Sequence, residues 1–474
     1  MKDMDTPILD MINAAAGSAR VRFCMPGHKG KAAFLPEDVD FLDLTEIPGM
    51  DNLYAAEGAI LRSEQSYAET VGAADAFYLV NGSTCGLQAA ILSALRPGDH
   101  IICSRDVHVS VVSAMILAGL EPYFIRPRKS VGPLPNVATP EDVEKAIAVN
   151  RDAKAVCVTY PNYYGLCPDL ETISAMAHEA GMIMLCDAAH AATFDFSHLL
   201  PASPSQCGCD LWVTSLHKTL PAMNQCAALL MGRQCPVPVR DIQDRLNWVQ
   251  TTSPSYLLLG SAEYALGLME AHGEELLAQT IVMVKETIPR IEGLGGYKVV
   301  TADIPYQTGA YDRDILRLVI DVTDRGLTGI ACGRELMRRG VVVAAADLSN
   351  LILICTIADE PEDFERLVRA LASINGGMYS LEQPMTNEEV NRAYESELAM
   401  PLREAALAAR EPVPFADSEG RIAAISAGAF PPGVPMLLPG QRITAKNIRV
   451  MRYLRRRGFG VFGFGDTIEV VKES

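Results

Sequence analysis

The sequence predicts an α/β fold in which a largely parallel sheet is covered by helices on both faces. Between residues 75 and 230, short continuous apolar runs alternate with stretches whose apolar residues recur every three or four positions. Strands that are apolar throughout are typical of sheets buried on both faces, and such sheets are mostly parallel. The expected strands are Ala76–Val80, Ile101–Ser104, Ala155–Thr159, Met182–Cys186, Leu211–Thr214 and Ala227–Met231.

Helices are expected between these strands, for example at Cys85–Leu95 and Glu141–Val149, and a long helical connector is expected at 261–293. Beyond the connector the pattern changes to that of a smaller α+β unit. Its expected strands are Ile315–Val322, Val341–Ala345 and Leu351–Thr356, and its expected helices lie near 328–339 and 361–373.

The C-terminal part of the chain has a third pattern. A polar stretch at 386–410 is expected to be helical, and the Pro/Gly-rich segment Phe430–Gly440 is expected to be an ordered loop or a linker. The basic run Arg455–Arg457 indicates a solvated helix end. The predicted organisation is an N-terminal segment, a major domain, a small α+β domain and a C-terminal domain, at residues 1–55, 56–293, 294–380 and 381–474.

Composition excludes several classes of protein. The 474 residues carry a formal net charge of −17, which argues against binding to nucleic acid or to anionic membranes. The twelve cysteines form no CxxC pair, and the closest two, Cys207 and Cys209, are separated by one residue, so no metal site is predicted. The chain shows neither a signal-peptide pattern nor an apolar run long enough to span a membrane, and we expect a cytoplasmic protein.

Polar loops follow four of the expected strands, in the position where open α/β sheets usually bind ligands. The loop Val80–Gly86 places small and hydroxyl residues at the start of a helix, whose free N–H groups favour an anion such as phosphate. The alternative is an ordinary helix N-cap formed by Ser83 or Thr84. Because the loop matches neither a P-loop nor a GxGxxG fingerprint, it does not indicate a nucleotide site.

The other three loops each bring one ionisable group to the end of a strand. These groups are His108, Asp187 and Lys218, the last within Ser215-Leu-His-Lys218. A carboxylate or an ammonium beside a buried strand loses hydration and needs a partner. Taken singly, a histidine is more often structural than catalytic, and the carboxylate can simply cap the next segment. A lysine is seldom placed at the end of a buried strand, although an ordinary surface lysine stays the alternative.

Taken together, the four loops supply a phosphate cradle, a flat imidazole, a buried acid and an amine at one edge of the sheet. Pyridoxal 5′-phosphate needs an anion site, a surface to stack against its ring, a partner for its pyridine nitrogen and a lysine for a Schiff base. The sequence therefore predicts an enzyme that uses this cofactor.

Long and unusual motifs run nearly from end to end of the chain. They are FCMPGHKG (23–30), DLTEIPGMDNL (43–53), NGSTCG (81–86), RDVHVSV (105–111), YPNYYGLCPDL (160–170), CDAAHAA (186–192), SLHKTLPAMNQ (215–225), TTSPSYLL (251–258) and FPPGVPMLLPG (430–440). With them the chain resembles the pyridoxal-phosphate-dependent ornithine/lysine/arginine decarboxylases of the aspartate-aminotransferase fold, in the short form without an N-terminal wing domain. The resemblance implies fold type I: a mostly parallel, seven-stranded sheet between helices, with a smaller α+β C-terminal region.

The resemblance also implies a role for each matching residue. Lys218 would form the Schiff base and Asp187 would pair with the pyridine nitrogen, with Ala189 and His190 beside it. His108 would stack on the cofactor ring. His217 would contact the cofactor or transfer a proton. The residues implied as phosphate ligands are Ser83, Thr84 and Ser215, joined by Thr252 or Ser253 from a neighbouring subunit.

The implied reaction is decarboxylation of a basic amino acid, with arginine to agmatine first and lysine or ornithine next, feeding polyamine metabolism. The implied assembly is a homodimer or tetramer with the active site at the interface. His28 and Gln441 are the expected substrate-pocket residues. The family usually has tyrosine and glutamate where this chain has Phe430 and Gln441, and a glutamine loses the charge attraction for a cationic substrate.

Two other hypotheses stay open on sequence alone. The loss of charge at Gln441 favours a decarboxylase or aminotransferase for a less cationic amino acid. A non-catalytic binding or assembly subunit is the alternative of another class, against which the retained Lys218, Asp187 and His108 argue. In the family Asp-Glu-Ala-His-Gly is usual where this chain has Asp187-Ala-Ala-His-Ala191, which keeps the acid and the small residue two positions later.

Overall fold

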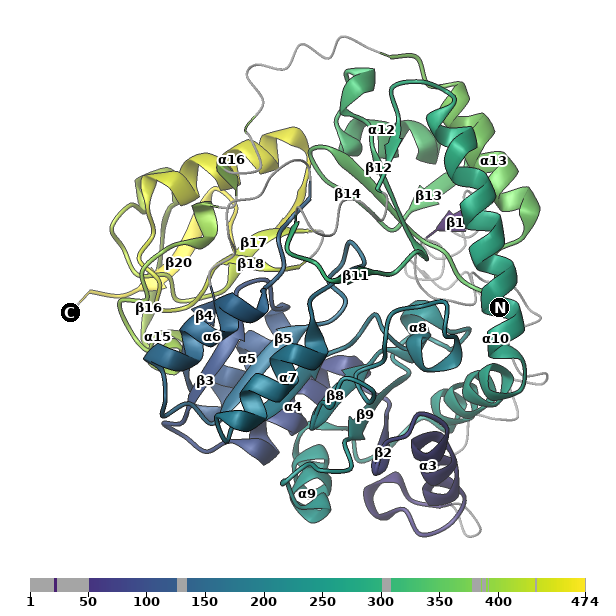
Figure 1. Cartoon of the computed structure of the whole chain (residues 1–474). Helices are drawn as coiled ribbons and strands as arrows, with labels where there is room; N and C mark the ends of the chain where they lie inside the picture. The colour runs from purple at the N-terminus through teal and green to yellow at the C-terminus, as the bar shows by residue number, and fades with distance from the viewer. Residues whose placement is uncertain are drawn as a thin grey trace, which may run out of the picture.

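The computed structural model describes residues 21–23, 51–125, 134–300, 308–376, 385, 389–390, 392–430 and 433–473. At its centre lies a seven-stranded sheet with the order β2-β9-β8-β7-β5-β3-β4 (Figure 1). β9 runs antiparallel to both of its neighbours, and the other pairs in this sheet are parallel. The strands are β2 (Asp75–Leu79), β3 (His100–Ser104), β4 (Glu121–Ile125), β5 (Ala155–Thr159), β7 (Ile183–Asp187), β8 (Leu211–Thr214) and β9 (Ala227–Met231).

The predicted fold class is confirmed, and the six expected strands form with shifts of at most one residue at either end. β4 was not expected from the sequence. Its residues, Glu-Pro-Tyr-Phe-Ile, form the edge of the sheet and are mostly solvent-accessible, so they lack the continuous apolar character of the central strands.

Both faces of the sheet are buried because alternate residues of each strand enter different hydrophobic clusters. In β2, Phe77 and Leu79 belong to one cluster while Ala76 and Tyr78 belong to the other. The first cluster includes residues of α4 (Gly82–Ala94), α5 (Val109–Ala118) and α9 (Val239–Val249). The second includes residues of α3 (Ala59–Thr70), α6 (Pro140–Val149), α7 (Leu170–Glu179) and α10 (Tyr256–Glu292).

The expected α+β unit forms an antiparallel sheet of order β10-β12-β15-β14. The run expected at Val341–Ala345 divides in two, because β13 leaves this sheet to pair in parallel with β1. The unit shares a hydrophobic cluster with the major sheet. Its elements are β1 (Val21–Phe23), β10 (Lys298–Val299), β12 (Arg317–Asp321), α12 (Gly329–Arg338), β13 (Val341–Val343), β14 (Ala345–Ala346), β15 (Asn350–Ile354) and α13 (Pro361–Ala372).

The C-terminal region has its own hydrophobic cluster and two small sheets, ordered β18-β17-β19 and β16-β20. The basic run Arg455–Arg457 ends α16, as expected, and Gly458 follows it in the left-handed region with φ 89°. Its elements are α15 (Leu402–Leu407), β16 (Arg410–Pro414), β17 (Ala427–Phe430), β18 (Pro435–Leu437), α16 (Ala445–Arg457), β19 (Gly460–Phe462) and β20 (Thr467–Val471).

Two expectations for this region need correction. The expected helix at 386–410 is wrong over most of its described length, where a 3-10 turn at Arg392–Tyr394 and the six-residue α15 are separated by extended chain. Polar helical periodicity without an apolar face does not hold a helix together unless other segments pack on it. The segment Phe430–Gly440 is not a linker, because β18 within it pairs with β17.

Arg105 joins the C-terminal region to the major sheet. Its guanidinium is buried between the rings of Phe124 and Tyr394, whose centroids lie 5.5 and 5.1 Å from Cζ. Its Nε and Nη2 donate to the carbonyl oxygens of Tyr394 and Met436 at 3.2 and 3.0 Å. A cation at the end of β3 is therefore held by backbone from the far end of the chain.

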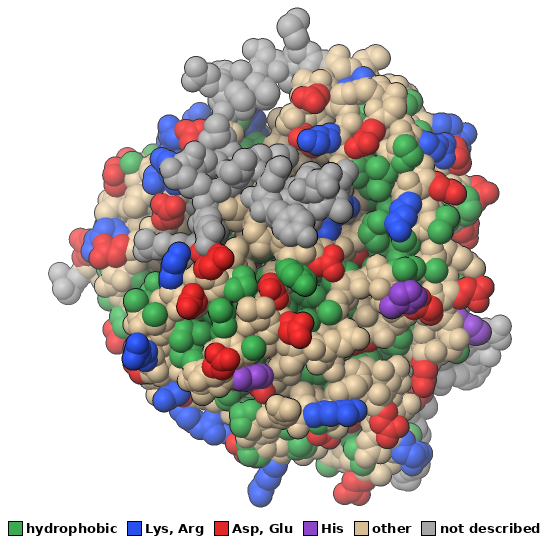
Figure 2. All heavy atoms as spheres, in the orientation of Figure 1, with side chains coloured by type: hydrophobic (Ala, Val, Ile, Leu, Met, Phe, Trp, Pro, Cys, Tyr) green, Lys and Arg blue, Asp and Glu red, His purple; other side chains and the backbone are tan. Residues whose placement is uncertain are grey.

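Acidic and basic side chains are interspersed over the face of the molecule shown in Figure 2. Within the described part of the chain, no helix is both long and apolar enough to cross a membrane.

Candidate active site

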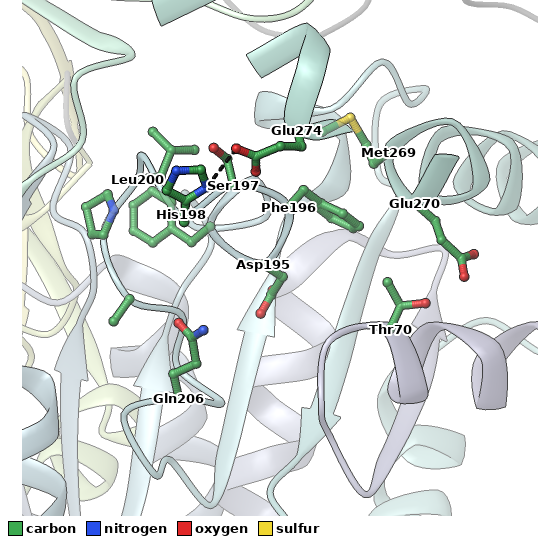
Figure 3. A pocket seen from close by; sticks show the side chains of 13 residues that line it. Thr70, Asp195, Phe196, Ser197, His198, Leu200, Gln206, Met269, Glu270 and Glu274 are labelled. Carbon is green, nitrogen blue, oxygen red and sulfur yellow. Dashed lines mark ion pairs between the residues drawn. The ribbon is translucent and has the colours of Figure 1, made fainter. Parts of the chain in front are cut away.

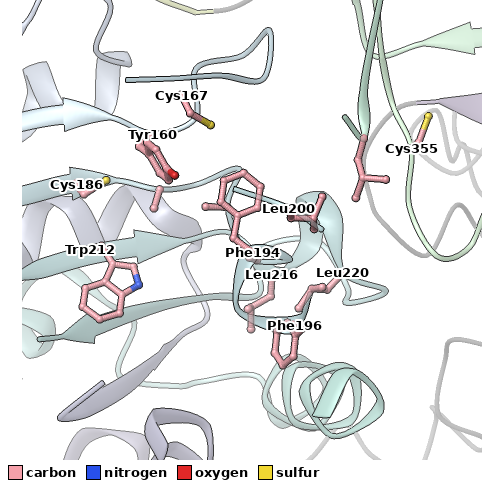
Figure 4. Packing of buried hydrophobic residues seen from close by; sticks show 14 of the residues in the cluster. Tyr160, Cys167, Cys186, Phe194, Phe196, Leu200, Trp212, Leu216, Leu220 and Cys355 are labelled. Carbon is pink, nitrogen blue, oxygen red and sulfur yellow. The ribbon is translucent and has the colours of Figure 1, made fainter. Parts of the chain in front are cut away.

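Lys218 lies in a single helical turn, α8 (Leu216–Thr219), that follows β8 directly. Leu216 and Leu220, two residues to either side, are fully buried among aromatic side chains that include Phe194 and Phe196 (Figure 4). Burying both leucines fixes the turn, and the partly buried lysine points away from this packing toward His190, with 3.2 Å between Nζ and Nε2. The amine therefore has a defined polar neighbour in place of bulk water.

Asp187 ends β7, the strand next to β8, and its side chain is buried. One carboxylate oxygen accepts from the backbone N–H of Ala189 at 3.3 Å. No further hydrogen bond to this carboxylate is found within the described residues, so it keeps acceptor capacity in the site.

The environment of Lys218 favours its neutral form. The pKa of Lys218 is lowered to about 8: burial is the main cause, the carboxylate of Asp187 opposes it, and the positive charge of Arg317 adds a smaller lowering. At neutral pH an appreciable share of this amine is therefore unprotonated, which is the form that attacks a carbonyl carbon.

His190 is buried between charged and aromatic neighbours. Its Nδ1 lies 2.6 Å from Nη2 of Arg317, and its ring meets that of Tyr163 edge to face with 5.3 Å between centroids. Burial holds the pKa of His190 well below its usual range, and the charges of Lys218 and Arg317 act in the same direction. The imidazole is neutral at physiological pH.

His108 caps the N-terminus of α5. Its Nδ1 accepts from the backbone N–H of Ser110 at 3.2 Å and lies 2.8 Å from the Ser110 hydroxyl. Burial lowers the pKa of His108, Lys218 adds to this effect and Asp187 opposes it. A Cβ placed on Gly433, which has φ +82°, would lie 3.3 Å from two ring atoms of His108, so the C-terminal region packs directly on this ring.

The expected phosphate cradle lies at the N-terminus of α4. The N-cap residue Asn81 makes no side-chain cap hydrogen bond to the helix, which leaves its first turn to accept an anion. The hydroxyl of Ser215 donates to that of Ser83 at 3.0 Å, which joins the loop before Lys218 to this cradle. Ser215 is fully buried, Ser83 partly buried and Thr84 exposed.

His217 has a defined tautomer. Its Nδ1 lies 2.8 Å from the carbonyl oxygen of Cys226, and because a carbonyl can only accept, Nδ1 carries the proton and Nε2 carries the lone pair. The pKa of His217 is lowered to about 4: burial is the main cause, the hydrogen bond to the Cys226 carbonyl opposes it, and the charge of Lys218 adds a smaller lowering. His217 is therefore a neutral side chain whose Nε2 can accept a hydrogen bond but has no proton to donate to a phosphate.

Besides Thr84, two more of the expected site residues lie on the surface, and one lies outside the described residues. Thr252 and Ser253 are exposed, directly after Thr251, whose N–H donates to the side chain of Asn81 at 3.4 Å. This segment therefore lies beside the start of α4 within the same protomer. His28 lies outside the described residues.

Gln441 has a different setting from the one expected. Its side chain is 3% exposed, its Oε1 accepts from the N–H of Leu438 at 2.9 Å, and its Nε2 donates to the carbonyl of Ser396 at 2.9 Å. Both ends of the amide are committed to backbone groups of the C-terminal region. Within the described residues these contacts join two backbone segments, and the expectation that Gln441 lines the substrate pocket stays a prediction.

A separate hollow of about 580 Å³ lies between the 3-10 turn Phe194–Phe196 and α10 (Figure 3). Asp195 and Glu270 line it, and His198 pairs with Glu274 at 2.8 Å between Nδ1 and Oε1. None of the expected site residues lines it, so we do not assign it to the active site. Among the described residues, no group of three or more histidine, cysteine or acidic side chains is arranged to hold a metal ion.

The residues gathered around Lys218 fit pyridoxal 5′-phosphate. Asp187 offers a buried carboxylate with spare acceptor capacity for a protonated ring nitrogen, and His108 offers a flat ring. The start of α4 with Ser83 and Ser215 offers an anion site, and Lys218 offers an amine with a lowered pKa. Fold and site together define a fold type I enzyme that uses this cofactor.

Comparison with known proteins gives the family. Residues 6–309 match the model of the Orn/Lys/Arg decarboxylase major domain, and residues 382–460 match that of the Orn/Lys/Arg decarboxylase C-terminal domain. The chain belongs to the Orn/Lys/Arg decarboxylase family, and it is a pyridoxal-phosphate-dependent amino-acid decarboxylase.

Relatives match over the full length of the chain. An arginine decarboxylase of Bacillus subtilis is 32% identical, covering 100% of this chain and 99% of the relative. An arginine decarboxylase of Halalkalibacterium halodurans is also 32% identical, covering 99% and 98%. The solved structure of the Escherichia coli constitutive lysine decarboxylase shares the fold, with a TM-score of 0.76 and 18% identity over 98% of this chain and 82% of that one.

Two neighbours in the site were missed by sequence reasoning. Arg317 and Tyr163 both contact His190, yet they come from segments far along the chain that converge only on folding. A signal was available for Arg317, since a single cation within the apolar run Ile315–Val322 is unusual in a strand of this kind. Tyr163 lies in the quoted motif YPNYYGLCPDL but carries no sequence feature that points to His190.

Proposed function

We propose that this chain decarboxylates a basic amino acid and that arginine, converted to agmatine, is the preferred substrate. The observation that supports this choice is the full-length match to arginine decarboxylases at 32% identity, compared with 23% for a lysine decarboxylase of Pseudomonas aeruginosa. The product would serve polyamine synthesis. We further propose that the enzyme acts in the cytoplasm.

The side chains divide the chemistry between them. Bound pyridoxal 5′-phosphate accepts the electron pair that the departing CO2 leaves on the substrate Cα. Asp187 would keep the cofactor ring nitrogen protonated, and His108 would hold the ring in place from one face. Lys218, with a pKa near 8, both supplies the amine that holds the cofactor and carries a proton that can be delivered to Cα. His217 is neutral near pH 7 and its ring proton is held at Nδ1 by the Cys226 carbonyl, so we do not assign it as the donor of that proton.

We propose a homodimer or a tetramer in which Thr252 or Ser253 completes the phosphate site of the neighbouring subunit. Their exposure at the end of the segment that contacts Asn81 supports this arrangement, because a second subunit could reach them. Mixing a Lys218→Ala protein with a Thr252→Ala, Ser253→Ala protein tests it. Regained activity in the mixture supports a shared site, and a mixture as inactive as its parts contradicts it.

A substrate panel tests the activity. Cofactor-loaded protein is offered arginine, lysine, ornithine and neutral amino acids, and CO2, amine and keto acid are measured. We expect the highest kcat/KM with arginine and agmatine as the product. Equal or better turnover of a neutral amino acid, or a keto acid without CO2, would instead favour the less cationic substrate or the aminotransferase.

A further inference from the structure

Arg317 is a buried cation with no role in the chemistry described so far. It belongs to β12 of the small sheet, is 1% exposed and reaches across to the major domain. Its Nε lies 3.7 Å from the carboxylate of Asp314, and its Nη1 has no hydrogen-bond partner among the described residues. Burying a guanidinium costs free energy because the group loses its hydration. This cost is offset only where the guanidinium forms ion pairs or hydrogen bonds.

The backbone is shaped to admit this side chain. Gly165 has φ +80°, and a Cβ at that position would lie 2.6 Å from Cβ and Cγ of Arg317, closer than real contacts allow. The glycine therefore leaves the space through which Arg317 passes on its way to His190. The space belongs to the motif YPNYYGLCPDL, which also supplies Tyr163 on the ring of His190.

The contact between Arg317 and His190 determines where the imidazole proton lies. A guanidinium has donors and no acceptor, so His190 Nδ1, 2.6 Å from Nη2, must accept. A neutral imidazole that accepts at Nδ1 carries its proton at Nε2. His190 Nε2 is 3.2 Å from Lys218 Nζ, so the N–H points at the amine and the amine nitrogen accepts.

We propose that Arg317 is a positioning residue, which holds His190 in the Nε2–H tautomer and so directs a hydrogen-bond donor at Lys218 Nζ. An ammonium has no lone pair and cannot accept this hydrogen bond, so the arrangement favours the neutral, nucleophilic amine. This inference rests on the proposed function, because it assumes that Lys218 is the amine that binds the cofactor. It does not depend on which amino acid is the substrate.

The charges around Lys218 agree with this arrangement. Lys218 is faced by Asp187 from β7, by His190 from the loop after β7, by Arg317 from β12, and by His108 at the start of α5. His217, its neighbour in α8, is neutral at physiological pH. Burial is the main cause that holds the pKa of His190 well below its usual range, and the positive charges of Lys218 and Arg317 act in the same direction. Protonation of His190 would also set two cationic donors against each other at 2.6 Å.

The first test reads the tautomer directly in the unmodified protein. The chain has eight histidines, and labelling them with 15N allows each ring nitrogen to be classified as protonated or unprotonated by NMR. His190→Gln identifies the signals of His190. We expect unprotonated Nδ1 and protonated Nε2 in both the cofactor-free and the cofactor-loaded protein. A proton on Nδ1, or on both nitrogens, would overturn the proposal without any variant at Arg317.

The second test removes the arginine. In Arg317→Met we expect a His190 signal with protonated Nδ1 to appear, and Arg317→Lys should preserve the wild-type tautomer because an ammonium also only donates. Arg313→Met is a matched control. Arg313 is partly buried and donates to the carbonyl oxygens of Val300 and Arg317, the latter at 3.2 Å, and no hydrogen bond between it and His190 is found among the described residues. Its removal should leave the His190 signals unchanged.

The same variants are compared by the pH dependence of Lys218 labelling in cofactor-free protein, using formaldehyde with a mild reductant and mass spectrometry. Losing the Arg317 charge and the His190 donor should move the labelling midpoint upward in Arg317→Met, and a midpoint higher by about one pH unit slows labelling at neutral pH about tenfold. Arg317→Lys should stay near wild type. Unchanged His190 signals and an unchanged midpoint in Arg317→Met would overturn the proposal. Neither readout uses an amino-acid substrate, so a failure of arginine turnover is recognised separately.

Discussion

Replacing Gln441 by glutamate separates a structural role at this position from a role in the substrate pocket. In the wild type, Gln441 accepts from the N–H of Leu438 and donates to the carbonyl of Ser396, both at 2.9 Å. A glutamate can keep the first hydrogen bond. When ionised it has no donor for the second, and it turns an oxygen toward the carbonyl of Ser396.

The expected cost follows from these contacts. Losing the donor to Ser396 leaves its partly buried carbonyl unpaired, which costs about 1 to 3 kcal/mol. A protonated carboxyl can donate to the same carbonyl, so binding a proton is favoured in the folded protein and the pKa of the new carboxyl rises above its ordinary value of about 4.3. A raised pKa gives stability that is present at low pH and lost as pH rises. The deficit of Gln441→Glu should therefore grow from about pH 5 to about pH 8.

The assay is local, because a chain with several cooperative units has no single unfolding free energy. Hydrogen exchange of the peptide that contains Leu438 is compared between wild type and Gln441→Glu at both pH values, together with thermal unfolding. Gln206→Glu is the control. Gln206 is exposed and its Oε1 accepts from the N–H of Ser203 at 2.9 Å, so a glutamate there keeps the hydrogen bond and should change little.

The opposite result would refute this reasoning. If Gln441→Glu leaves exchange and thermal stability unchanged at about pH 8 and raises kcat/KM for arginine by about tenfold, the size of a hydrogen bond to a charged group, then position 441 faces the substrate. The hydrogen bonds of its side chain to Leu438 and Ser396 would then not be the ones present during catalysis.

Lys218, Glu64 and Arg105 give three further predictions. Lys218→Ala should lose the visible absorption that the cofactor gives when attached to wild-type protein, and an unchanged spectrum would contradict the assignment of this lysine. Glu64 accepts from the N–H of Tyr78 at 2.8 Å and burial raises its pKa to about 8. The contribution of Glu64 to stability is therefore lost as pH rises. The unfolding temperature of Glu64→Gln should increase relative to that of wild type as pH rises toward about 9. A difference in unfolding temperature that does not depend on pH would contradict the raised pKa of Glu64. Arg105→Met should speed hydrogen exchange in residues 392–473 more than in the central strands, because the hydrogen bonds to Tyr394 and Met436 are lost; uniform exchange would speak against this link.

The central strands could be predicted because their own sequence of apolar residues is enough to identify them. Ala155–Thr159 and Leu211–Thr214 are buried on both faces, so an apolar run of the right length suffices. β4 could not be predicted in the same way, since a half-exposed edge strand needs no apolar run. The expected helix at 386–410 failed because whether a polar stretch forms a helix depends on what packs against it.

The site residues likewise separate into those that local sequence could place and those that depend on how distant segments pack together. Asp187, His108 and Lys218 could be placed near one another because each follows a strand of the same sheet, and strand ends converge. The contact of Arg317 with His190 depends on how the small sheet docks onto the large one, which local sequence does not encode. For Gln441 the motif position predicts a pocket residue, and sequence reasoning alone did not show that its buried side chain also bonds two backbone segments.

The packing of Gly433 on His108 makes the order of synthesis important for this enzyme. The ribosome completes Asp187 and Lys218 near the middle of the chain, but the residue that lies against the His108 ring is made long afterwards, together with the carbonyl of Met436 that holds Arg105. A polypeptide released or cleaved before this region can contain every residue needed to hold the cofactor and still lack one wall of its site. Incomplete chains are therefore expected to lack the finished site, and decarboxylation becomes available only once nearly the whole protein has been made.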